Sequence, residues 1–392
     1  MRRTLFLVVA IGLLAPLHAQ TFASRAGSLK AVAIAGPFAF PWAMAWLPDG
    51  RLLVTERDGR LDLVTDGKTI TVAGVPTVAT GGQGGLFDVL VLPKTDDGQE
   101  LLLSYAWADR DGKSLRVSRF TLTGDDGKSW RLEKQQTLFD LLPRSAGSIQ
   151  FGGRLALLPD GTLLIATGDR GEMPRAQDFG DGAGKVHRIN LAGGVPSDNP
   201  FLGKPGYLPT IWTLGHRNIQ GLWVDAATGA VWATEHGPMG GDEVNRLLPG
   251  RNYGWPIITY GVNYGSGTKI GEGFEKPGME QPILYWKPSI APSGLTYYDG
   301  DKAPGWKGSF VSGALAGQGL SRFRIGEATQ AQTKPDRATL PAHPPAWLLE
   351  EEFLPSGTLG RIRDVRTGPD GFLYLTTDSP RGMVYRLDET EH

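Results

Sequence analysis

The sequence predicts an all-β fold, a six-bladed β-propeller with long loops over one end of the axis. One phrase, in which apolar residues, a turn and an apolar strand follow one another, recurs six times at intervals of roughly 45 to 70 residues. No long stretch shows a helical period with caps. The chain also holds 55 glycines and 28 prolines, which indicates many tight turns.

Each copy of the phrase reads as a β-hairpin, because a turn rich in Asp, Gly or Pro separates two apolar runs. One hairpin cannot bury its own face. Repeats of this length therefore favour four-stranded blades around an axis over an extended β-sandwich, which is the second interpretation. The turns and the strands that follow them are 47–50 with 52–55, 91–98 with 101–104, 158–161 with 163–167, 225–229 with 231–234, 298–300 with 309–312, and 368–371 with 373–376.

Three segments between the repeats are rich in Gly, Pro and polar residues and hold few strand patterns: 169–209, 251–292 and 326–360. Loops of a propeller collect over one end of the axis, where they form a binding face. The first two segments carry the unusual polar residues, so we expect them at that face. The third is expected to be a plain surface loop.

Composition excludes several classes of function. The net charge of the 392 residues is -1, from 40 basic and 41 acidic side chains, which argues against nucleic acid or anionic lipid as the main partner. The absence of cysteine from the sequence excludes disulfides, thiolate metal sites and a cysteine nucleophile. With 40% hydrophobic residues, a sizeable core is expected.

Residues 1–19 read as an export signal. Arg2 and Arg3 precede a short apolar run at 5–17, and Ala19 offers a small residue at a cleavage point before Gln20. The run is too short to span a bilayer comfortably, and an uncleaved anchor is the second interpretation. We expect residues 20–392 to form a single propeller domain that is periplasmic or secreted and has no membrane span after cleavage. The arginine pair leaves both the general and the twin-arginine export routes open.

The stretch 214–264 combines charged, amide and aromatic side chains with glycines and prolines. A solvated loop does not need its tryptophans, and a core strand does not tolerate its charges. One interpretation is a pocket floor whose polar groups face a bound molecule. The other is an Arg-Asn-Glu network that ties loops together.

Eight motifs in a fixed order resemble those of a known family. The resemblance is to soluble quinoprotein aldose sugar dehydrogenases of the glucose/sorbosone dehydrogenase family, and it covers nearly all of residues 41–387. The motifs are Gly84-Gly85-Leu86 after Gln83, Gly152-Gly153-Arg154-Leu155, Gly215-His216-Arg217-Asn218, Glu235-His236-Gly237-Pro238, Gly241-Asp242-Glu243, Asn252-Tyr253-Gly254-Trp255-Pro256, Pro288-Ser289-Ile290-Ala291-Pro292-Ser293-Gly294 and Arg361-Ile362-Arg363-Asp364-Val365.

The resemblance implies a propeller that holds pyrroloquinoline quinone (PQQ) and Ca²⁺ on its axis. Arg217 and Asn218 would contact the PQQ carboxylates and quinone oxygens, and Arg361 and Arg363 would clamp further carboxylates. Guanidinium groups suit a tricarboxylate because they pair with it bidentately. At Ala316 some relatives carry a Lys that contacts PQQ, so this chain lacks that contact.

The resemblance also implies metal and sugar contacts. The backbone carbonyls of Gly237 and Pro238 would ligate a Ca²⁺ that polarises the quinone, and hard oxygen ligands suit this ion. A second, structural Ca²⁺ would be bound by Glu243 and the carbonyl of Tyr253. The side chains expected to face the sugar are Gln83 and Tyr264.

The family oxidises the sugar at C1 to a lactone by hydride transfer to the quinone and passes the electrons to an external acceptor. It uses a His base oriented by an Asp. The Asp corresponds to Asp169, but the position of the His holds Gln150. An amide cannot accept the proton, and losing a general base costs about 10²–10⁴-fold in rate.

Two hypotheses therefore stand side by side: an active aldose dehydrogenase in which Asp169 acts as the base, and a catalytically weakened or inactive propeller that still binds PQQ or sugar. A calcium-dependent lactonase ranks last, because the motifs offer arginines rather than converging acidic ligands. His216 and His236 are expected to have structural hydrogen-bonding roles, and His187 to be a packed or surface residue. Both a monomer and a homodimer remain open.

Overall fold

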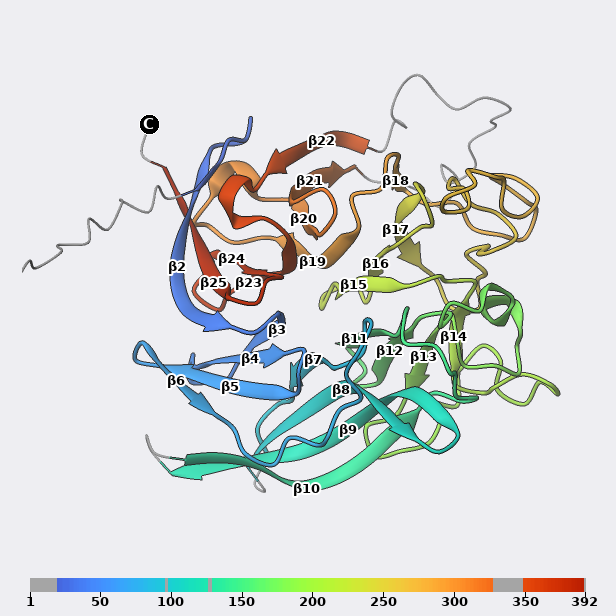
Figure 1. Ribbon diagram of the computed structural model, residues 1–392, viewed down its shortest axis with the longest axis horizontal. Helices are drawn as coiled ribbons and strands as arrows, with labels where there is room; N and C mark the ends of the chain where they lie inside the picture. Colours follow the sequence, from blue (N-terminus) through green and yellow to red (C-terminus); the bar gives the residue numbers. More distant parts are fainter. Residues whose placement is uncertain (1–19, 96–97, 126–128, 327–347, 391–392) are drawn as a thin grey trace, which may run out of the picture.

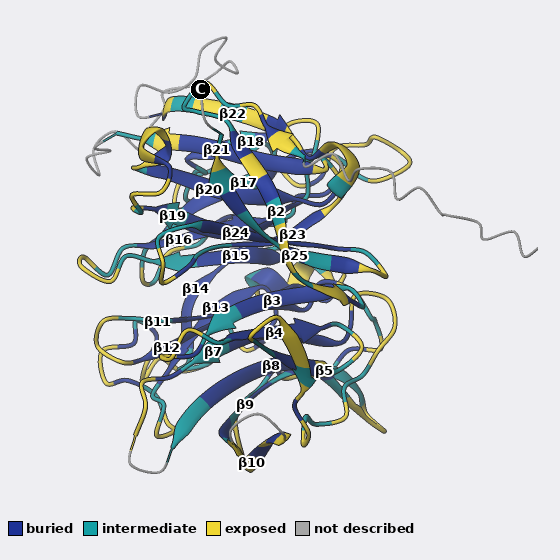
Figure 2. Ribbon diagram, turned by 90° about the vertical axis from the view of Figure 1, so that its left-hand side faces the viewer, coloured by how far each residue is buried: buried dark blue, intermediate teal, exposed yellow. Residues whose placement is uncertain are grey.

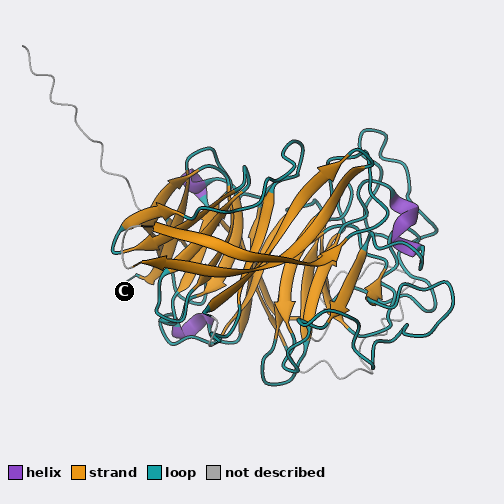
Figure 3. Cartoon of the chain, turned by 90° about the horizontal axis from the view of Figure 1, so that it is seen from below, coloured by secondary structure: helices purple, strands orange, loops and turns teal. Residues whose placement is uncertain are grey.

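The computed structural model describes residues 20–95, 98–125, 129–326 and 348–390, so the predicted signal at 1–19 lies outside the described residues. The described chain is almost entirely β-structure, arranged as six sheets around one axis (Figure 1). The six-bladed propeller predicted from the repeats is confirmed. Within the described residues, helical structure is limited to three short 3-10 turns at the periphery, η1 (Met173–Gln177), η2 (Pro304–Trp306) and η4 (Gly357–Leu359) (Figure 3).

Five blades follow the chain from the innermost to the outermost strand. Blade 1 is β3 (Pro41–Trp46), β4 (Leu52–Glu56), β5 (Arg60–Thr65) and β6 (Lys68–Thr71), and blade 2 is β7 (Leu86–Val91), β8 (Gln99–Asp109), β9 (Gly112–Asp125) and β10 (Ser129–Asp140). Blade 3 is β11 (Gly152–Leu157), β12 (Leu163–Thr167), β13 (Lys185–Ile189) and β14 (Ile211–Leu214). Blade 4 is β15 (Ile219–Val224), β16 (Val231–Glu235), β17 (Asp242–Leu247) and β18 (Leu284–Trp286), and blade 5 is β19 (Pro292–Tyr298), β20 (Ser309–Ala314), β21 (Gly319–Ile325) and β22 (Leu348–Pro355).

The sixth blade is built from both ends of the chain. β23 (Ile362–Thr367), β24 (Leu373–Thr377) and β25 (Gly382–Glu389) come from the C-terminal part. β2 (Leu29–Phe38) pairs antiparallel with β25, and β1 (Thr21–Phe22) pairs with β2. The ring is thus closed by backbone hydrogen bonds between the first and last strands. The repeat did not reveal this closure, since the recurring phrase covers only the first two strands of each blade.

All six recurring turns lie between the first and second strands of a blade, and therefore at one end of the axis. Among the described residues, each of the three segments predicted to hold few strand patterns contains a strand, which in 251–292 is β18, and the prediction that 326–360 is a plain surface loop was wrong. The segment 169–209 contains β13, and the presumed surface loop 326–360 contains the outer strand β22; residues 327–347 lie outside the described part of the chain. β22 was not predicted because three consecutive glutamates, Glu350–Glu352, interrupt the apolar pattern of the strand. On this edge strand, Glu350 and Glu352 pair with the buried Arg322 of β21 at 2.7 and 2.5 Å.

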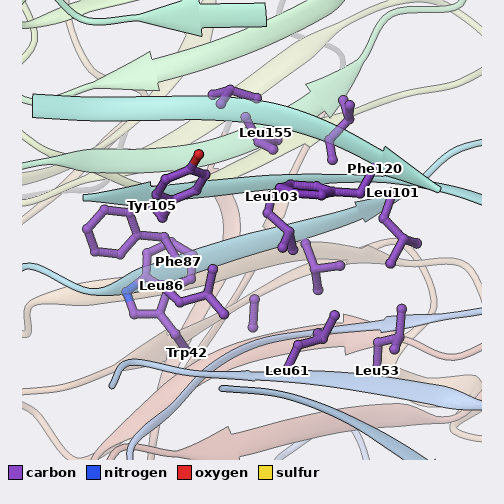
Figure 4. Packing of buried hydrophobic residues seen from close by; sticks show 14 of the residues in the cluster. Trp42, Leu53, Leu61, Leu86, Phe87, Leu101, Leu103, Tyr105, Phe120 and Leu155 are labelled. Carbon is purple, nitrogen blue, oxygen red and sulfur yellow. The ribbon is translucent and has the colours of Figure 1, made fainter. Parts of the chain in front are cut away.

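The largest apolar core lies between blades 1, 2 and 3, with side chains such as Leu53, Phe87, Leu101 and Phe120 in contact across the sheets (Figure 4). Strands packed on both faces are buried along their whole length, whereas outer strands alternate between buried and exposed residues (Figure 2). The outer strands can therefore carry charge without weakening the core.

A buried charge network joins the innermost strands around the axis. The Arg154 guanidinium contacts Asp364 at 3.0 Å and Asp88 at 3.5 Å, and its Nε donates to the carbonyl of Gln220 at 2.6 Å. Arg366 bridges the same two carboxylates, at 2.9 Å to Asp88 and 3.0 Å to Asp364. Asp88, Arg154 and Asp364 belong to the first strands of blades 2, 3 and 6, so their charges hold these inner strands together.

We expect Arg154→Met to lower the free energy of unfolding by about 3–5 kcal/mol, because it leaves two buried carboxylates to share a single guanidinium. Denaturant unfolding measures this. Arg131→Met is the matched control, since Arg131 is exposed and its pairing with Glu133 is a surface contact expected to matter by less than about 1 kcal/mol. Equal stabilities of the two variants would show that the central network is dispensable.

Candidate active site

A cavity of about 260 Å³ lies on the axis, at the end where the first strand of each blade begins and the second strand ends. Among the described residues, the lining of this cavity contains three arginines and no carboxylate. The lining residues are Trp42, Arg57, Gln83, Phe87, Phe151, Gly152, Asn218, Gln220, His236, Ala291, Leu315, Arg361 and Arg363.

The backbone explains why so many side chains converge at this end. In every blade the pairing of the first with the second strand shifts register near the cavity, for example between Gly152 and Leu155, between Ile219 and Gly221, and between Ile362 and Asp364. Such bulges bend a strand and re-aim its side chains. Six bulges around one axis turn the starts of the inner strands toward a common point.

The arginines have few counter-charges near the cavity. Asp378, which follows β24, accepts from Arg361 Nε at 2.9 Å and from Arg363 Nη2 at 3.4 Å. Burial acts to raise the pKa of Asp378, but the neighbouring Arg363 and Arg361 outweigh it and lower that pKa. Burial lowers the pKa of Arg363 to about 10, which leaves it charged at neutral pH. Arg57, stacked on Phe40 at 4.5 Å, adds a third positive charge.

An amide cluster from blades 3 and 4 lies beside these arginines. Asn218 Oδ1 accepts from the backbone N–H of Gly152 at 3.1 Å and from Gln220 Nε2 at 3.2 Å. Gln220 Oε1 in turn accepts from Arg363 Nη1 at 3.1 Å. The cluster holds Asn218 in one orientation at the cavity wall.

Gln150 and Gln83 lie together at the same rim. Gln83 Oε1 accepts from the backbone N–H of Gln150 at 2.7 Å. Gln150 has a φ of 53°, a left-handed conformation that is strained for a residue with a side chain. Its Oε1 is buried and has no hydrogen-bond partner among the described residues. An unpartnered amide oxygen held by a strained backbone is suited to receive a donor from a bound molecule.

Asp169 follows β12 and is 1% exposed. One carboxylate oxygen accepts from Trp255 Nε1 at 2.7 Å and the other from the backbone N–H of Gly171 at 2.8 Å. Burial raises the pKa of Asp169 above its ordinary value, against the opposing effect of these hydrogen bonds. The carboxylate is thus a stronger base than an exposed aspartate.

Of the histidines expected to be structural, His236 lines the cavity. Its Nε2 lies 2.8 Å from the carbonyl oxygen of Pro292, so that nitrogen carries the proton. Burial, and then the charges of Arg217 and Arg363, lower its pKa to about 3. His236 is therefore neutral at neutral pH and is a weak base.

The other two histidines lie away from the cavity lining. His216 is buried between Thr213 and Glu235, with ring nitrogens 2.9 and 3.0 Å from these partners. His187 is also buried, and both of its ring nitrogens are bonded, to Thr210 and to the carbonyl of Gly182. For these two residues the geometry agrees with the structural roles expected from the sequence.

The carbonyls of Gly237 and Pro238 follow β16. Arg217 Nη1 donates to the Gly237 oxygen at 2.6 Å, and the hydroxyls of Tyr264 and Ser289 lie 3.1 and 3.2 Å from the Pro238 oxygen. The Gly237 carbonyl is therefore in contact with a positive charge already. Two adjacent carbonyl oxygens of this kind are ligands that Ca²⁺ accepts.

A second oxygen-rich group surrounds Asn245 of β17. Its Nδ2 donates to Glu235 and Glu243 at 3.0 Å each, while its Oδ1 is buried without a partner among the described residues. Burial, and then the charge of Glu235, raise the pKa of Glu243 well above its ordinary value. A cation at these oxygens would relieve both the unpaired acceptor and the repulsion. The described chain shows no group of three or more His, Asp or Glu side chains arranged to hold a metal ion.

The structure brings most of the predicted residues together. The predicted residues Gln83, Asn218, Arg361 and Arg363 line the cavity, while Gln150, Asp169 and Arg217 lie directly behind the lining. Ala316 is exposed, and its neighbour Leu315 is the lining residue. Tyr264 is 65% exposed on a loop. The ring of Tyr253 stacks on His216, near Glu235.

Sequence reasoning missed Arg57, Trp42 and Gln220. A signal for Arg57 is present in the repeat. Arg57, His236, Leu315 and Asp378 each come directly after the second strand of their blade. Reading that one position across the six repeats would have identified Arg57 and Asp378.

Residues 38–386 match the family model described as Glucose / Sorbosone dehydrogenase. The chain is 38% identical over 352 residues to aldose sugar dehydrogenase YliI of Escherichia coli (strain K12), which covers 88% of this chain and 89% of that protein. It resembles the crystal structure of the soluble aldose sugar dehydrogenase of Escherichia coli in its apo form with a TM-score of 0.83 and 36% identity, over 92% and 100% of the two chains. A PQQ-bound aldose sugar dehydrogenase from Streptomyces coelicolor has a TM-score of 0.72 and 27% identity, over 92% and 98%.

We expect Trp255→Phe to raise the pKa of Asp169 further, because it removes an N–H that stabilises the ionised carboxylate. When the pKa of an acidic group is higher in the folded than in the unfolded state, the protein loses stability as the pH rises from the unfolded-state pKa to the folded-state pKa. The variant should extend this loss of stability to higher pH. Carboxyl NMR titration gives the pKa directly. Trp46→Phe, in blade 1 against Tyr374, is the control, and an unchanged or lower pKa of Asp169 in Trp255→Phe would contradict the assignment.

Proposed function

The chain belongs to the glucose/sorbosone dehydrogenase family, and we propose that it is a PQQ- and calcium-dependent dehydrogenase that oxidises aldoses at C1 to lactones. The electrons pass to an external acceptor. One observation carries the proposal: the axial cavity is lined by three arginines and, among the described residues, by no carboxylate. Such a cavity attracts a small polyanion, and PQQ is a tricarboxylate of that kind.

The residues present fit PQQ. Arg57, Arg361 and Arg363 would hold its carboxylates, with Asn218 as a further hydrogen-bonding side chain at the wall. Arg363 Nε is buried without a partner among the described residues, so this guanidinium has a donor left for a ligand. Arg217, which lies behind the wall, would add to the positive field. Ala316 adds no long side chain to the site, and Arg57 supplies a third positive charge at the cavity lining.

The carbonyls of Gly237 and Pro238 would hold a catalytic Ca²⁺ next to the cofactor. The oxygens around Asn245, with Glu243 and the Tyr253 carbonyl, would hold the structural one. Hard oxygen donors of both groups suit Ca²⁺. When bound, PQQ would supply the two-electron acceptor, and the Ca²⁺ beside it would supply a Lewis acid.

The protein's own side chains then bind the sugar and remove its hydroxyl proton. We assign Gln83 and the exposed Tyr264 to the sugar, and the unpartnered Gln150 Oε1 to a sugar hydroxyl. Two groups near the cavity can accept a proton, the lining residue His236 and Asp169 behind the lining. Asp169 has a raised pKa and His236 a pKa of about 3, so the carboxylate of Asp169 is the stronger base. Asp169 is the catalytic base in this proposal.

Gln150 supports the alternative function, a propeller that binds PQQ and sugar and turns over slowly. The strained backbone and the bond to Gln83 hold an amide where the family's base would stand. The two functions differ in rate, while the cofactor site is common to both.

The cellular setting is part of the proposal. The signal-like residues 1–19 would direct the protein to the periplasm or out of the cell, as a monomer or a homodimer. No helix within the described residues is long and apolar enough to cross a membrane.

We expect Arg361→Met to weaken PQQ binding roughly 10- to 100-fold, the effect of losing one charge-assisted hydrogen-bonding group. Titration of the purified apoprotein with PQQ in the presence of Ca²⁺, followed by quenching of tryptophan fluorescence, measures it without turnover. Arg131→Met on the outer strand β10 is the control for a lost surface charge. Unaltered affinity in Arg361→Met would remove Arg361 from the cofactor site.

Reconstitution with PQQ and Ca²⁺, followed by an aldose and a redox dye, tests turnover. We expect the parent and Gln150→His to bind PQQ equally and the variant to reduce the dye roughly 10²–10⁴-fold faster, because imidazole restores an efficient base. Equal rates would mean that position 150 is not limiting. Asp169→Asn would then abolish activity in the parent if Asp169 is the base. Failure of both proteins to bind PQQ would refute the cofactor assignment.

A further inference from the structure

A second cavity, of about 880 Å³, lies between blades 4 and 5 at the opposite end of the axis. It is lined by the turn that follows β15, whereas the axial cavity is lined by residues at the start of that strand. Six residues of extended chain separate the two ends by about 20 Å. The second cavity is therefore distinct from the site proposed for the cofactor.

Two facing rows of cross-strand neighbours form its walls. In blade 4, Trp223 pairs with Trp232, and Trp232 pairs with Arg246. In blade 5, Tyr297 pairs with Phe310. The rows touch, since the Trp223 ring lies 5.3 Å from Tyr297 and the Trp232 ring lies 4.9 Å from Phe310. Trp223 and Tyr297 stay partly exposed, so aromatic surface is open to a ligand.

Arg246 is the polar group that these walls leave without a partner. Its Nε is buried and unpaired, and its guanidinium has no hydrogen bond or ion pair within the described ranges of the chain. The other lining arginine, Arg366, is already neutralised by Asp88 and Asp364. A buried donor without a partner is costly, and a ligand acceptor would remove that cost.

The charges select the class of ligand. Asp225 and Asp299 line the same cavity, so the single free guanidinium does not leave a positive surplus for an anion. A purely apolar molecule would cover the aromatic rings but leave Arg246 unsatisfied. A sugar ring meets both demands, because its C–H face stacks on aromatic rings while its hydroxyls accept from Arg246 and donate to Asp299.

We propose that the cavity between blades 4 and 5 is a second carbohydrate-binding site, with the pyranose ring on Trp223 and Tyr297 and a hydroxyl on Arg246. It binds sugar without oxidising it. The inference does not depend on the chemistry proposed for the axial cavity, since its residues belong to another end of the propeller.

The test is calorimetric titration of the full chain with trehalose and with methyl β-D-glucoside, whose blocked C1 atoms prevent oxidation. We expect both to bind, and Arg246→Met and Trp223→Ala each to weaken binding roughly tenfold. Arg246→Lys keeps a charge without the Nε donor and should recover part of the affinity. Gln83→Ala, at the sugar position proposed in the axial cavity, should bind these sugars like the parent, and dye reduction by Arg246→Met should equal that of the parent.

Three results would overturn the proposal. They are no binding by the parent, undiminished binding by both Arg246→Met and Trp223→Ala, and loss of binding in Gln83→Ala instead, which would place the sugar in the axial cavity. Circular dichroism melting of each variant separates a binding defect from misfolding, and Arg246→Met is the variant less prone to disturb packing.

Discussion

The buried charges of Arg154, Asp88, Asp364 and Arg366 are the constraint on which the centre of the propeller depends. A propeller's inner strands are not hydrogen-bonded to one another, so the blades must be joined through side chains. Asp88 and Asp364 also accept from the backbone N–H groups of Leu155 and Met44, in the inner strands of blades 3 and 1. Blade 5 approaches through Gly294, where an added Cβ would lie 2.2 Å from Asp364.

This network sets the floor of the axial cavity. Arg154 stacks on Trp42 at 4.1 Å, and Trp42 lines the cavity above it. The two arginines and two aspartates of this network pair with one another, so its carboxylates do not neutralise the arginines that line the cavity. Among the described residues, Asp378 is the carboxylate that Arg57, Arg361 and Arg363 share. The central network neutralises its own charges, and the surplus of positive charge remains at the wall.

The same surroundings shift the pKa values of the two proton acceptors near the cavity, Asp169 and His236, in opposite directions. Asp169 is buried and His236 is partly buried, and the loss of water disfavours the charged form of each. For the carboxyl group this strengthens the base, whereas for the imidazole it weakens it, and the arginines weaken it further. The proton affinities of Asp169 and His236 are therefore set by burial and by the surrounding positive charge together.

The sequence by itself determined the all-β class and the six repeats, because turn residues and strand periodicity are local properties. The resemblance of its motifs to a known family indicated Gln83, Asn218, Arg361 and Arg363, which line the axial cavity. The sequence did not disclose β22, whose glutamates conceal an edge strand, or the closure by β2, which pairs with a strand about 350 residues later. The unpartnered Nε of Arg246 and the shifted pKa values of Asp169 and His236 were decided only by the tertiary structure. They depend on which distant groups surround a side chain and on how much water is excluded from it, and neither quantity is encoded in a local stretch of residues.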